Sequence, residues 1–239
     1  MKVTPLKCPI FKEGFNLNES IIKILKKKRF LPKEFILVIS SKIVSLSEKN
    51  LINPSTISKD HLIKKEAEIY LGKTTHNVHL TIKHGLLIPS AGIDLSNSEN
   101  SLYILLPKNP FKSAQEIWKS LIKEFPKNKI GVIISDSRSQ PLRRGVTGVS
   151  LAHFGFNATK KLIGKKDLFG RKLEATYVNV ADALSSAAVL CMGESDEAQP
   201  LAIIDKAPVR FSKSSNSNEI LIKIKEDLFF NKLFKKNEI

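Results

Sequence analysis

The chain has 239 residues, 42% of them hydrophobic and 26% charged, as expected for a soluble globular protein of one large or two small domains. It has no apolar run near the roughly 20 residues of a membrane span, no signal-peptide core at its N-terminus, and only two cysteines, far apart. We therefore expect a cytoplasmic protein with no membrane partner and no disulfide framework. The net charge of +16 suggests nucleic acid, but the lysines are scattered and arginine is scarce, so we expect no specific nucleic-acid partner.

The N-terminal part is predicted to contain one helix and one buried strand. Residues 5–15 hold two prolines and a glycine and indicate a loop with a short strand at most. A helix is expected to start at Asn18 and run to Phe30, with its lysines in the last turn. The apolar run Phe35–Ser40 predicts a buried strand. Ser41 and Lys42 follow it, where they could contact phosphate or metal, although capping a helix is the commoner role.

The next part alternates between helix and strand. The predicted elements are a turn and helix over 53–72, a strand over 78–88, a strand over 102–106, and a helix over 113–125. Ser113 and Glu116 have the spacing of a capping box, and Trp118 is expected to face the core. Gly72-Lys73-Thr74 is not a Walker A loop, because Ala67 stands where that motif needs glycine and the preceding segment is predicted as helix.

The segment Lys129–Gly148 holds the most informative pattern. Its apolar residues 130–134 predict a strand, which then breaks into Ser135-Asp136-Ser137, with Arg138, Arg143 and Arg144 shortly after. Side chains past the carboxyl end of a strand commonly face a ligand site. An acid, a hydroxyl and arginines there favour a metal with phosphates. The alternative is a turn whose Asp caps the following segment.

The C-terminal part contains one very apolar helix. It is predicted over 181–192 and stopped by Gly193, and the acidic cluster Glu194–Glu197 follows it. The other expected elements are a helix or turn over 149–156, a polar hairpin-like connection over 160–174, strands over 174–178 and 201–204, a loop over 212–219, and a strand and short helix over 220–234.

This order of elements predicts an α+β fold with mixed, partly antiparallel sheets and packed helices. We expect one unit over 1–239, which could divide into two lobes. Three oxygen-rich turns, at Asp94–Asn97, Asp136-Ser137 and Glu194–Glu197, each follow an apolar element. Their donors suit Mg²⁺ or Mn²⁺ shared with substrate phosphates.

Several segments, in order along nearly the whole chain, resemble the coenzyme F420-0:L-glutamate ligase (gamma-glutamyl ligase) family. In chain order they are SKIVS, KHGLLIPSAGIDLSN, LLPKNP, IISDSRSQPLRRG, DLFGRKLEATYVNVADALSSAAVLCMGESDE and the terminal EDLF. The third and fourth together are specific. The resemblance implies a GTP- or ATP-dependent ligase with two Mg²⁺ or Mn²⁺ ions, in a homodimer. It would join L-glutamate to the carboxylate of a heterocyclic acceptor through an acyl phosphate. The acceptor would be deazaflavin coenzyme F420-0 or a folate-type pterin.

The resemblance also implies roles for individual residues. By position, the family's metal ligands correspond to Asp94, Asp136, Ser137 and Glu194, and its nucleotide contact to Asn97. Arg143 matches a family arginine and is expected to hold phosphate or a substrate carboxylate. Arg138 is a second candidate catalytic arginine only because it lies in the same turn as the metal donors, since the family commonly has an aromatic residue there. Ser41 and Lys42 are candidates for contacting the nucleotide because of their place at a strand end.

The sequence departs from the family pattern around these donors. Leu46 replaces a lysine that contacts nucleotide, RSQP replaces FGRP at 138–141, Glu194 stands where many members have Gln, and the segment near 72–78 is short. Lys42 would have to take over the missing lysine's role from another position. These changes leave open the nucleotide and the acceptor. A non-catalytic family member and a basic nucleic-acid-binding protein are the alternatives.

Overall fold

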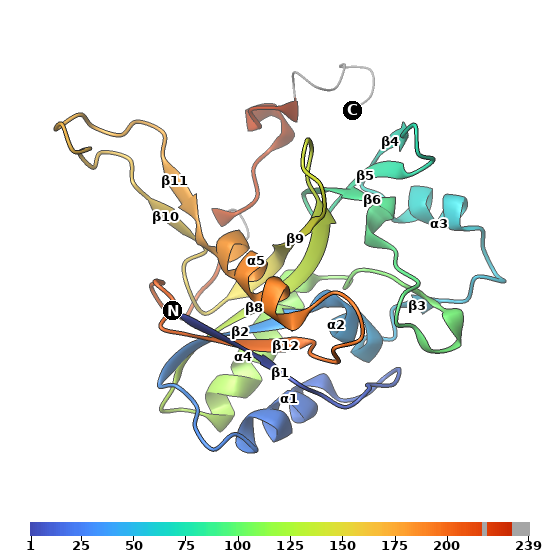
Figure 1. Ribbon diagram of the computed structural model, residues 1–239, viewed down its shortest axis with the longest axis horizontal. Coiled ribbons are helices and arrows are strands. Elements are labelled where there is room, and N and C mark those ends of the chain that lie inside the picture. The colour runs from blue at the N-terminus through green and yellow to red at the C-terminus, as the bar shows by residue number, and fades with distance from the viewer. Residues whose placement is uncertain (217–218, 231–239) are drawn as a thin grey trace.

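The computed structural model describes residues 1–216 and 219–230 (Figure 1). Its centre is a five-stranded sheet in the order β1-β12-β2-β8-β9. The central pair, β2 and β8, is parallel, and every other pair is antiparallel. The strands are β1 (Lys2–Leu6), β2 (Glu34–Ser40), β8 (Lys129–Ser139), β9 (Val146–Phe154) and β12 (Leu201–Asp205). The predicted α+β class with mixed, partly antiparallel sheets is confirmed.

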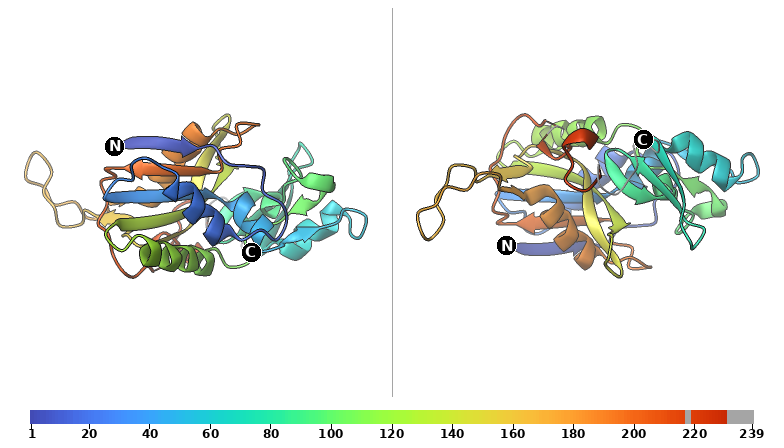
Figure 2. Two further views of the ribbon diagram at one scale, coloured as in Figure 1. Left: turned by 90° about the horizontal axis from the view of Figure 1, so that it is seen from below. Right: turned by 90° about the horizontal axis from the view of Figure 1, so that it is seen from above.

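Helices cover both faces of this sheet (Figure 2). They are α1 (Leu17–Lys26) and α4 (Pro110–Glu124) on one face, and α5 (Val180–Met192) on the other. Successive side chains of β2 point to opposite faces of the sheet. Leu37 packs in the cluster with α1 and α4, and Val38 packs in the cluster with α5. A strand buried on both sides is continuously apolar, which explains the run seen in the sequence.

A smaller part lies beside the carboxyl end of β2 and has its own apolar cluster around Leu62, Ile63 and Ile93. It contains α3 (Lys59–Glu66), a sheet of β4 (Ile69–Lys73), β5 (His79–Lys83) and β6 (Leu86–Pro89), and the pair β3 (Leu51–Ile52) and β7 (Tyr103–Ile104). The chain reaches this part from β2 through α2 (Ser41–Ser47), whose Ile43 and Val44 pack in the main cluster with α1 and α4. Short 3-10 helices span Ser90–Gly92, Glu99–Ser101 and Ile224–Glu226.

The opposite end of the molecule carries a projecting arm (Figures 1 and 2). The arm is an antiparallel pair of β10 (Thr159–Lys161) and β11 (Tyr177–Asn179) with the intervening loop at its tip. This agrees with the predicted hairpin-like connection, although the second strand lies three residues later than expected.

The two predicted N-terminal helix caps were wrong, whereas Gly193 ends α5 as predicted. Asn16 caps α1 by accepting a hydrogen bond from the Glu19 amide, so the helix starts at Leu17 and ends at Lys26. Asn109 caps α4, and proline follows it at the first helical position. Ser113 therefore lies inside the helix, where its hydroxyl donates to the Glu48 carboxylate instead of forming a capping box.

Four further predictions of helices or strands were wrong in whole or in part. Residues 69–73 form β4 rather than helix, so only Ala67 still argues against a Walker A loop. The segment 78–88 is the hairpin of β5 and β6, with His84 and Gly85 at positive φ in its turn. Residues 149–154 belong to β9 rather than to a helix or turn. No strand forms over the described residues 220–224, and the end of the predicted C-terminal helix lies outside the described residues.

Candidate functional site

The site lies at the sheet edge where the two parallel strands end. Ser40 of β2 pairs with Ser135 of β8, so the residues that follow them along the chain lie close together. After β2 the chain turns directly into α2, which begins with Ser41 and Lys42. The side chain of Ser41 is buried and that of Lys42 is partly exposed.

β8 does not end where the sequence suggested. It continues through Ser139 and forms a long hairpin with β9, with a register shift between Ile134 and Ser135. Asp136 and Ser137 therefore lie within a strand and not in a turn. Because side chains alternate along a strand, Asp136 and Arg138 share one face, and Ser137 points to the other.

Lys42 and Asp94 form the best-defined contact of the site. The Lys42 Nζ lies 2.7 Å from Asp94 Oδ2 and also donates to the backbone oxygen of Ser96 at 3.0 Å. The Ser96 amide and hydroxyl each donate to the Asp94 carboxylate at 2.8 Å. Burial of Asp94 opposes its ionisation, but these hydrogen bonds outweigh burial and hold its pKa below the ordinary value.

The pKa of Asp136 is shifted in the opposite direction from that of Asp94. Its burial raises the pKa of its carboxyl group to about 6. The Ser137 amide, the Lys42 charge and the Ser41 hydroxyl all favour the ionised form, but they do not offset burial, and the nearby Asp94 opposes ionisation further. Two carboxylates thus face one ammonium group, and one of them is held in a setting that disfavours its charge.

A second pair joins β8 to the loop after α5. Gly193 ends α5, and in the following loop Glu194 Oε2 accepts a hydrogen bond from Ser137 Oγ at 3.2 Å. The Asn97 side chain donates to the backbone oxygen of Ser195 at 3.0 Å. This contact ties the Asp94–Asn97 turn to the acidic loop. All three oxygen-rich segments therefore meet at one edge of the sheet.

The two candidate catalytic arginines fit the predicted site less well than the carboxylates do. Arg143 is exposed in the β8–β9 turn, and its guanidinium forms no hydrogen bond or ion pair with another described residue. Arg138 is half-buried, and its Nε is a buried donor without a partner among the described residues. Nor do three Asp, Glu, His or Cys side chains within the described ranges gather closely enough to hold a metal ion.

Ser96 is a site residue that the sequence analysis missed. It fixes both oxygens of Asp94, and it also accepts a hydrogen bond from Lys42 through its own hydroxyl. The signal was present, because an Asp followed two residues later by an amide donor is the pattern of an Asx turn. The sequence Asp94-Leu-Ser96 in a turn of small residues could have been interpreted in this way.

None of the helices formed by the described residues has the length and apolar character needed to cross a membrane.

Comparison with known proteins matches this chain to one family. The profile of the family described as F420-0:Gamma-glutamyl ligase matches residues 5–206. A coenzyme F420:L-glutamate ligase from Methanococcus maripaludis (strain C6) is 38% identical over 96% of this chain and 97% of its own length. Proteins of the same name from Methanocaldococcus jannaschii and Archaeoglobus fulgidus are 34% and 32% identical, covering 97% and 82% of this chain, and 97% and 83% of their own lengths. The match extends over all four segments that build the site, and the chain belongs to the F420-0:gamma-glutamyl ligase family.

Proposed function

We propose that this protein is a ligase that joins the amino group of L-glutamate to the carboxylate of a deazaflavin acceptor of the coenzyme F420 type. The observation that carries the proposal is the meeting of Asp94, Asp136 and Lys42 at the carboxyl edge of the parallel strands, in a chain of this family. The names of the relatives support the acceptor and the amino acid. The folate-type pterin remains a prediction, which is tested by offering dihydropteroate as the acceptor in a glutamylation assay.

The donor set fits a divalent cation that is shared with phosphate. Mg²⁺ in such sites is held by one or two carboxylates, and the substrate supplies further oxygens. Asp94 and Asp136 offer two carboxylates around one place, and Ser137 with Glu194 offers a hydroxyl and a carboxylate at a second. A cation would also relieve the unfavourable charge of Asp136. Bound there, Mg²⁺ or Mn²⁺ would neutralise phosphate charge.

The protein's own residues position the reactants and carry positive charge. In the proposed course, an acceptor carboxylate oxygen attacks the terminal phosphorus of GTP or ATP, and nucleoside diphosphate leaves. The glutamate amine then attacks the acyl phosphate carbonyl, phosphate leaves, and the amine loses a proton. Phosphoryl transfer of this kind needs mainly alignment and charge neutralisation. We assign Lys42 and Arg138 to phosphate, Asn97 and Ser41 to the nucleotide, and Arg143 to phosphate or a substrate carboxylate.

The structure gives a physical basis for replacing the family lysine at position 46. Lys42 and Leu46 both lie on α2, four residues apart, and residues with this spacing share one helix face. A lysine at 42 is therefore one helical turn from the position that the family lysine would occupy.

The setting of Asp136 predicts how the stability of the metal-free protein depends on pH. Because the folded-state pKa is raised from 3.8 to about 6, the native state holds a proton that the unfolded state releases between these pH values. Stability is therefore lost as pH rises through 6, by up to about 3 kcal/mol. We expect Asp136→Asn to raise the melting temperature by several degrees at pH 8 in EDTA, and to leave it nearly unchanged at pH 4.

Thermal denaturation at the two pH values, with Mn²⁺ added in a parallel series, measures this. Mn²⁺ should stabilise the wild type at pH 8 more than it stabilises the variant. Equal melting temperatures of variant and wild type at pH 8 would show that burial does not disfavour the ionised form of Asp136.

The function itself is tested by incubating the protein with L-glutamate, Mn²⁺ and coenzyme F420-0, with GTP or ATP in separate tubes. Mass spectrometry should show that the acceptor gains one glutamyl unit with at least one nucleotide. No gain with either would favour a non-catalytic member of the family.

A further inference from the structure

Ser96 contacts both partners of the ion pair between Lys42 and Asp94. Its hydroxyl oxygen lies 2.8 Å from Asp94 Oδ2 and 3.1 Å from the Lys42 Nζ, and its backbone oxygen lies 3.0 Å from the same Nζ. Its amide donates to Asp94 Oδ1 at 2.8 Å. Of the three acceptors that the Lys42 ammonium group contacts among the described residues, two therefore belong to Ser96.

The direction of the hydrogen bond from the Ser96 hydroxyl is determined by its neighbours. An ammonium group has three donors and no acceptor, so the Ser96 oxygen accepts from Lys42 and its single proton goes to the Asp94 carboxylate. Asp94 Oδ2 then receives two donors, whereas Oδ1 receives one, the Ser96 amide. Because each carboxylate oxygen has two lone pairs, the lone pair that no described donor uses belongs to Oδ1.

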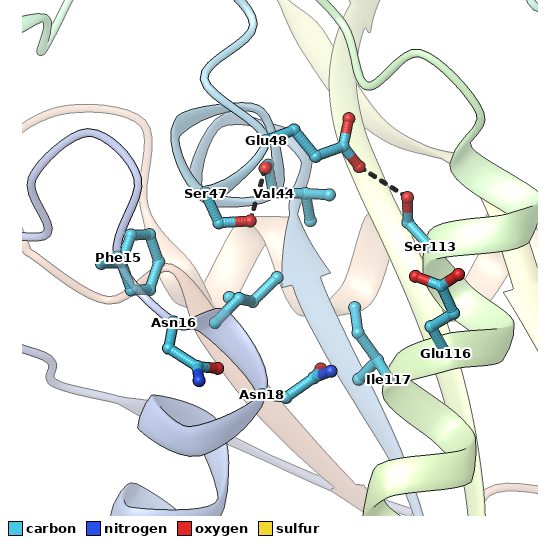
Figure 3. Close-up of a pocket in the computed structure, with 10 residues that line it drawn as sticks. Phe15, Asn16, Asn18, Val44, Ser47, Glu48, Ser113, Glu116 and Ile117 are labelled. Atoms are coloured by element: carbon cyan, nitrogen blue, oxygen red, sulfur yellow. Dashed lines mark hydrogen bonds between the residues drawn. The ribbon is translucent and has the colours of Figure 1, made fainter.

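The helix that carries Lys42 is anchored at its other end (Figure 3). Glu48 directly follows α2, and its carboxylate accepts a hydrogen bond from the Ser113 hydroxyl of α4 at 2.6 Å. The Asp94 carboxylate has no such second anchor in the part of the chain that the structure describes, where its hydrogen bonds come from Lys42 and Ser96. The orientation of this carboxylate relative to α2 therefore depends on Ser96.

We propose that Ser96 is a positioning residue for a divalent cation, because its hydroxyl occupies Asp94 Oδ2, leaves Oδ1 to bind the ion, and holds Lys42 beside it. The proposal rests on the proposed function, which assigns a cation to Asp94. Carboxylates that bind metals are themselves hydrogen-bonded, and loss of such a partner typically costs roughly 10- to 100-fold in metal affinity or activity. Without the hydroxyl, Oδ2 also has an open lone pair, so neither the binding oxygen nor the ammonium position is fixed.

The test measures Mn²⁺ binding to the full chain by electron paramagnetic resonance, without nucleotide or acceptor. Ser96→Ala keeps the amide contact with Oδ1 and should weaken Mn²⁺ binding about tenfold or more. Ser96→Thr keeps the hydroxyl and should restore binding. Ser55→Ala is the matched control and should bind as the wild type does, since the Ser55 amide donates to Asn53 Oδ1 at 3.0 Å in the same kind of turn outside the site.

Steady-state rates separate positioning of the cation from other roles of Ser96. In the glutamylation assay, Ser96→Ala should need about tenfold or more Mn²⁺ for its half-maximal rate, while its rate at saturating Mn²⁺ stays nearly unchanged. Because Ser96 is exposed, the variant should also melt close to the wild type in EDTA. A lower saturated rate with unchanged Mn²⁺ binding would assign the hydroxyl to a chemical step instead and would overturn the proposal.

The binding experiment also distinguishes failure of this proposal from failure of the cation site. If Ser96→Ala bound Mn²⁺ as tightly as Ser55→Ala, the role of Ser96 would be overturned while the cation site was kept. If Ser96→Thr bound as weakly as Ser96→Ala, the hydroxyl would not be the group responsible. If the wild type bound no Mn²⁺, the cation site itself would be wrong, and the role of Ser96 with it.

Discussion

Asp136→Asn and Asp94→Asn are each expected to lower turnover by about 10³-fold or more while the protein remains folded. Each variant keeps the shape of the side chain but removes one of the two carboxylates that meet at the strand ends. Loss of one such carboxylate weakens a bound cation and leaves phosphate charge uncompensated, an effect of several kcal/mol, and each ~1.4 kcal/mol is tenfold in rate. Asp136→Asn is the more informative variant, because a change that stabilises the metal-free protein cannot lower turnover by unfolding it.

Initial rates at saturating Mn²⁺, with folding checked by circular dichroism, measure this effect. Asp60→Asn is the matched control, since Asp60 also pairs with a lysine, Lys73, at 2.6 Å but lies on α3 outside the site. It should retain nearly full activity. Near-normal rates for Asp94→Asn or Asp136→Asn at saturating metal would show that the carboxylates were assigned wrongly.

Lys42→Met is expected to lower turnover by about 10²-fold or more. The ammonium group is the cation at the junction of the two carboxylates, and its contacts reach Asp94 and Ser96 directly. Removing one preorganised charged donor from a reacting phosphate typically costs a factor of about 10² to 10³. Methionine keeps most of the length of the side chain, so the loss measures the charge and its hydrogen bonds.

Lys73→Met is the control for this variant, because it breaks an equally short Lys–Asp contact outside the site. Steady-state rates of both variants should therefore differ by about two orders of magnitude. If Lys42→Met and Lys73→Met retained the same activity, Lys42 would be only a structural partner of Asp94, and Leu46 would leave the site without its lysine.

The parts of the fold that were predictable are those with a strong local pattern. The run Phe35–Ser40 was recognisable because burial on two faces of the sheet leaves few polar residues in a strand. The helix over 181–192 was recognisable from its apolar residues and from Gly193 at its end. β9 was missed because a short apolar segment of small residues looks the same in a buried strand and in a buried helix. This segment forms a strand because it pairs with β8, and the local sequence does not encode that pairing.

The site was predictable in its residue types but not in its geometry. The oxygen-rich turns pointed to the right segments, yet Asp136 and Ser137 lie within β8, because ladder pairing with β9 overrides the turn preference of Ser and Asp. The contact between Lys42 and Asp94 joins residues 52 positions apart. Its two partners come from different elements, so only the packing of α2 against the Asp94 turn brings them together.

We propose that this site adds glutamate to a carboxylate of a deazaflavin acceptor. The most direct measurement offers coenzyme F420-0 and dihydropteroate in separate tubes with L-glutamate, GTP or ATP, and Mn²⁺, and follows each acceptor by mass spectrometry. We expect coenzyme F420-0 to gain one glutamyl unit with the wild type, and we expect no gain with Asp136→Asn. Glutamylation of dihydropteroate alone, or of coenzyme F420-0 equally by both proteins, would contradict it.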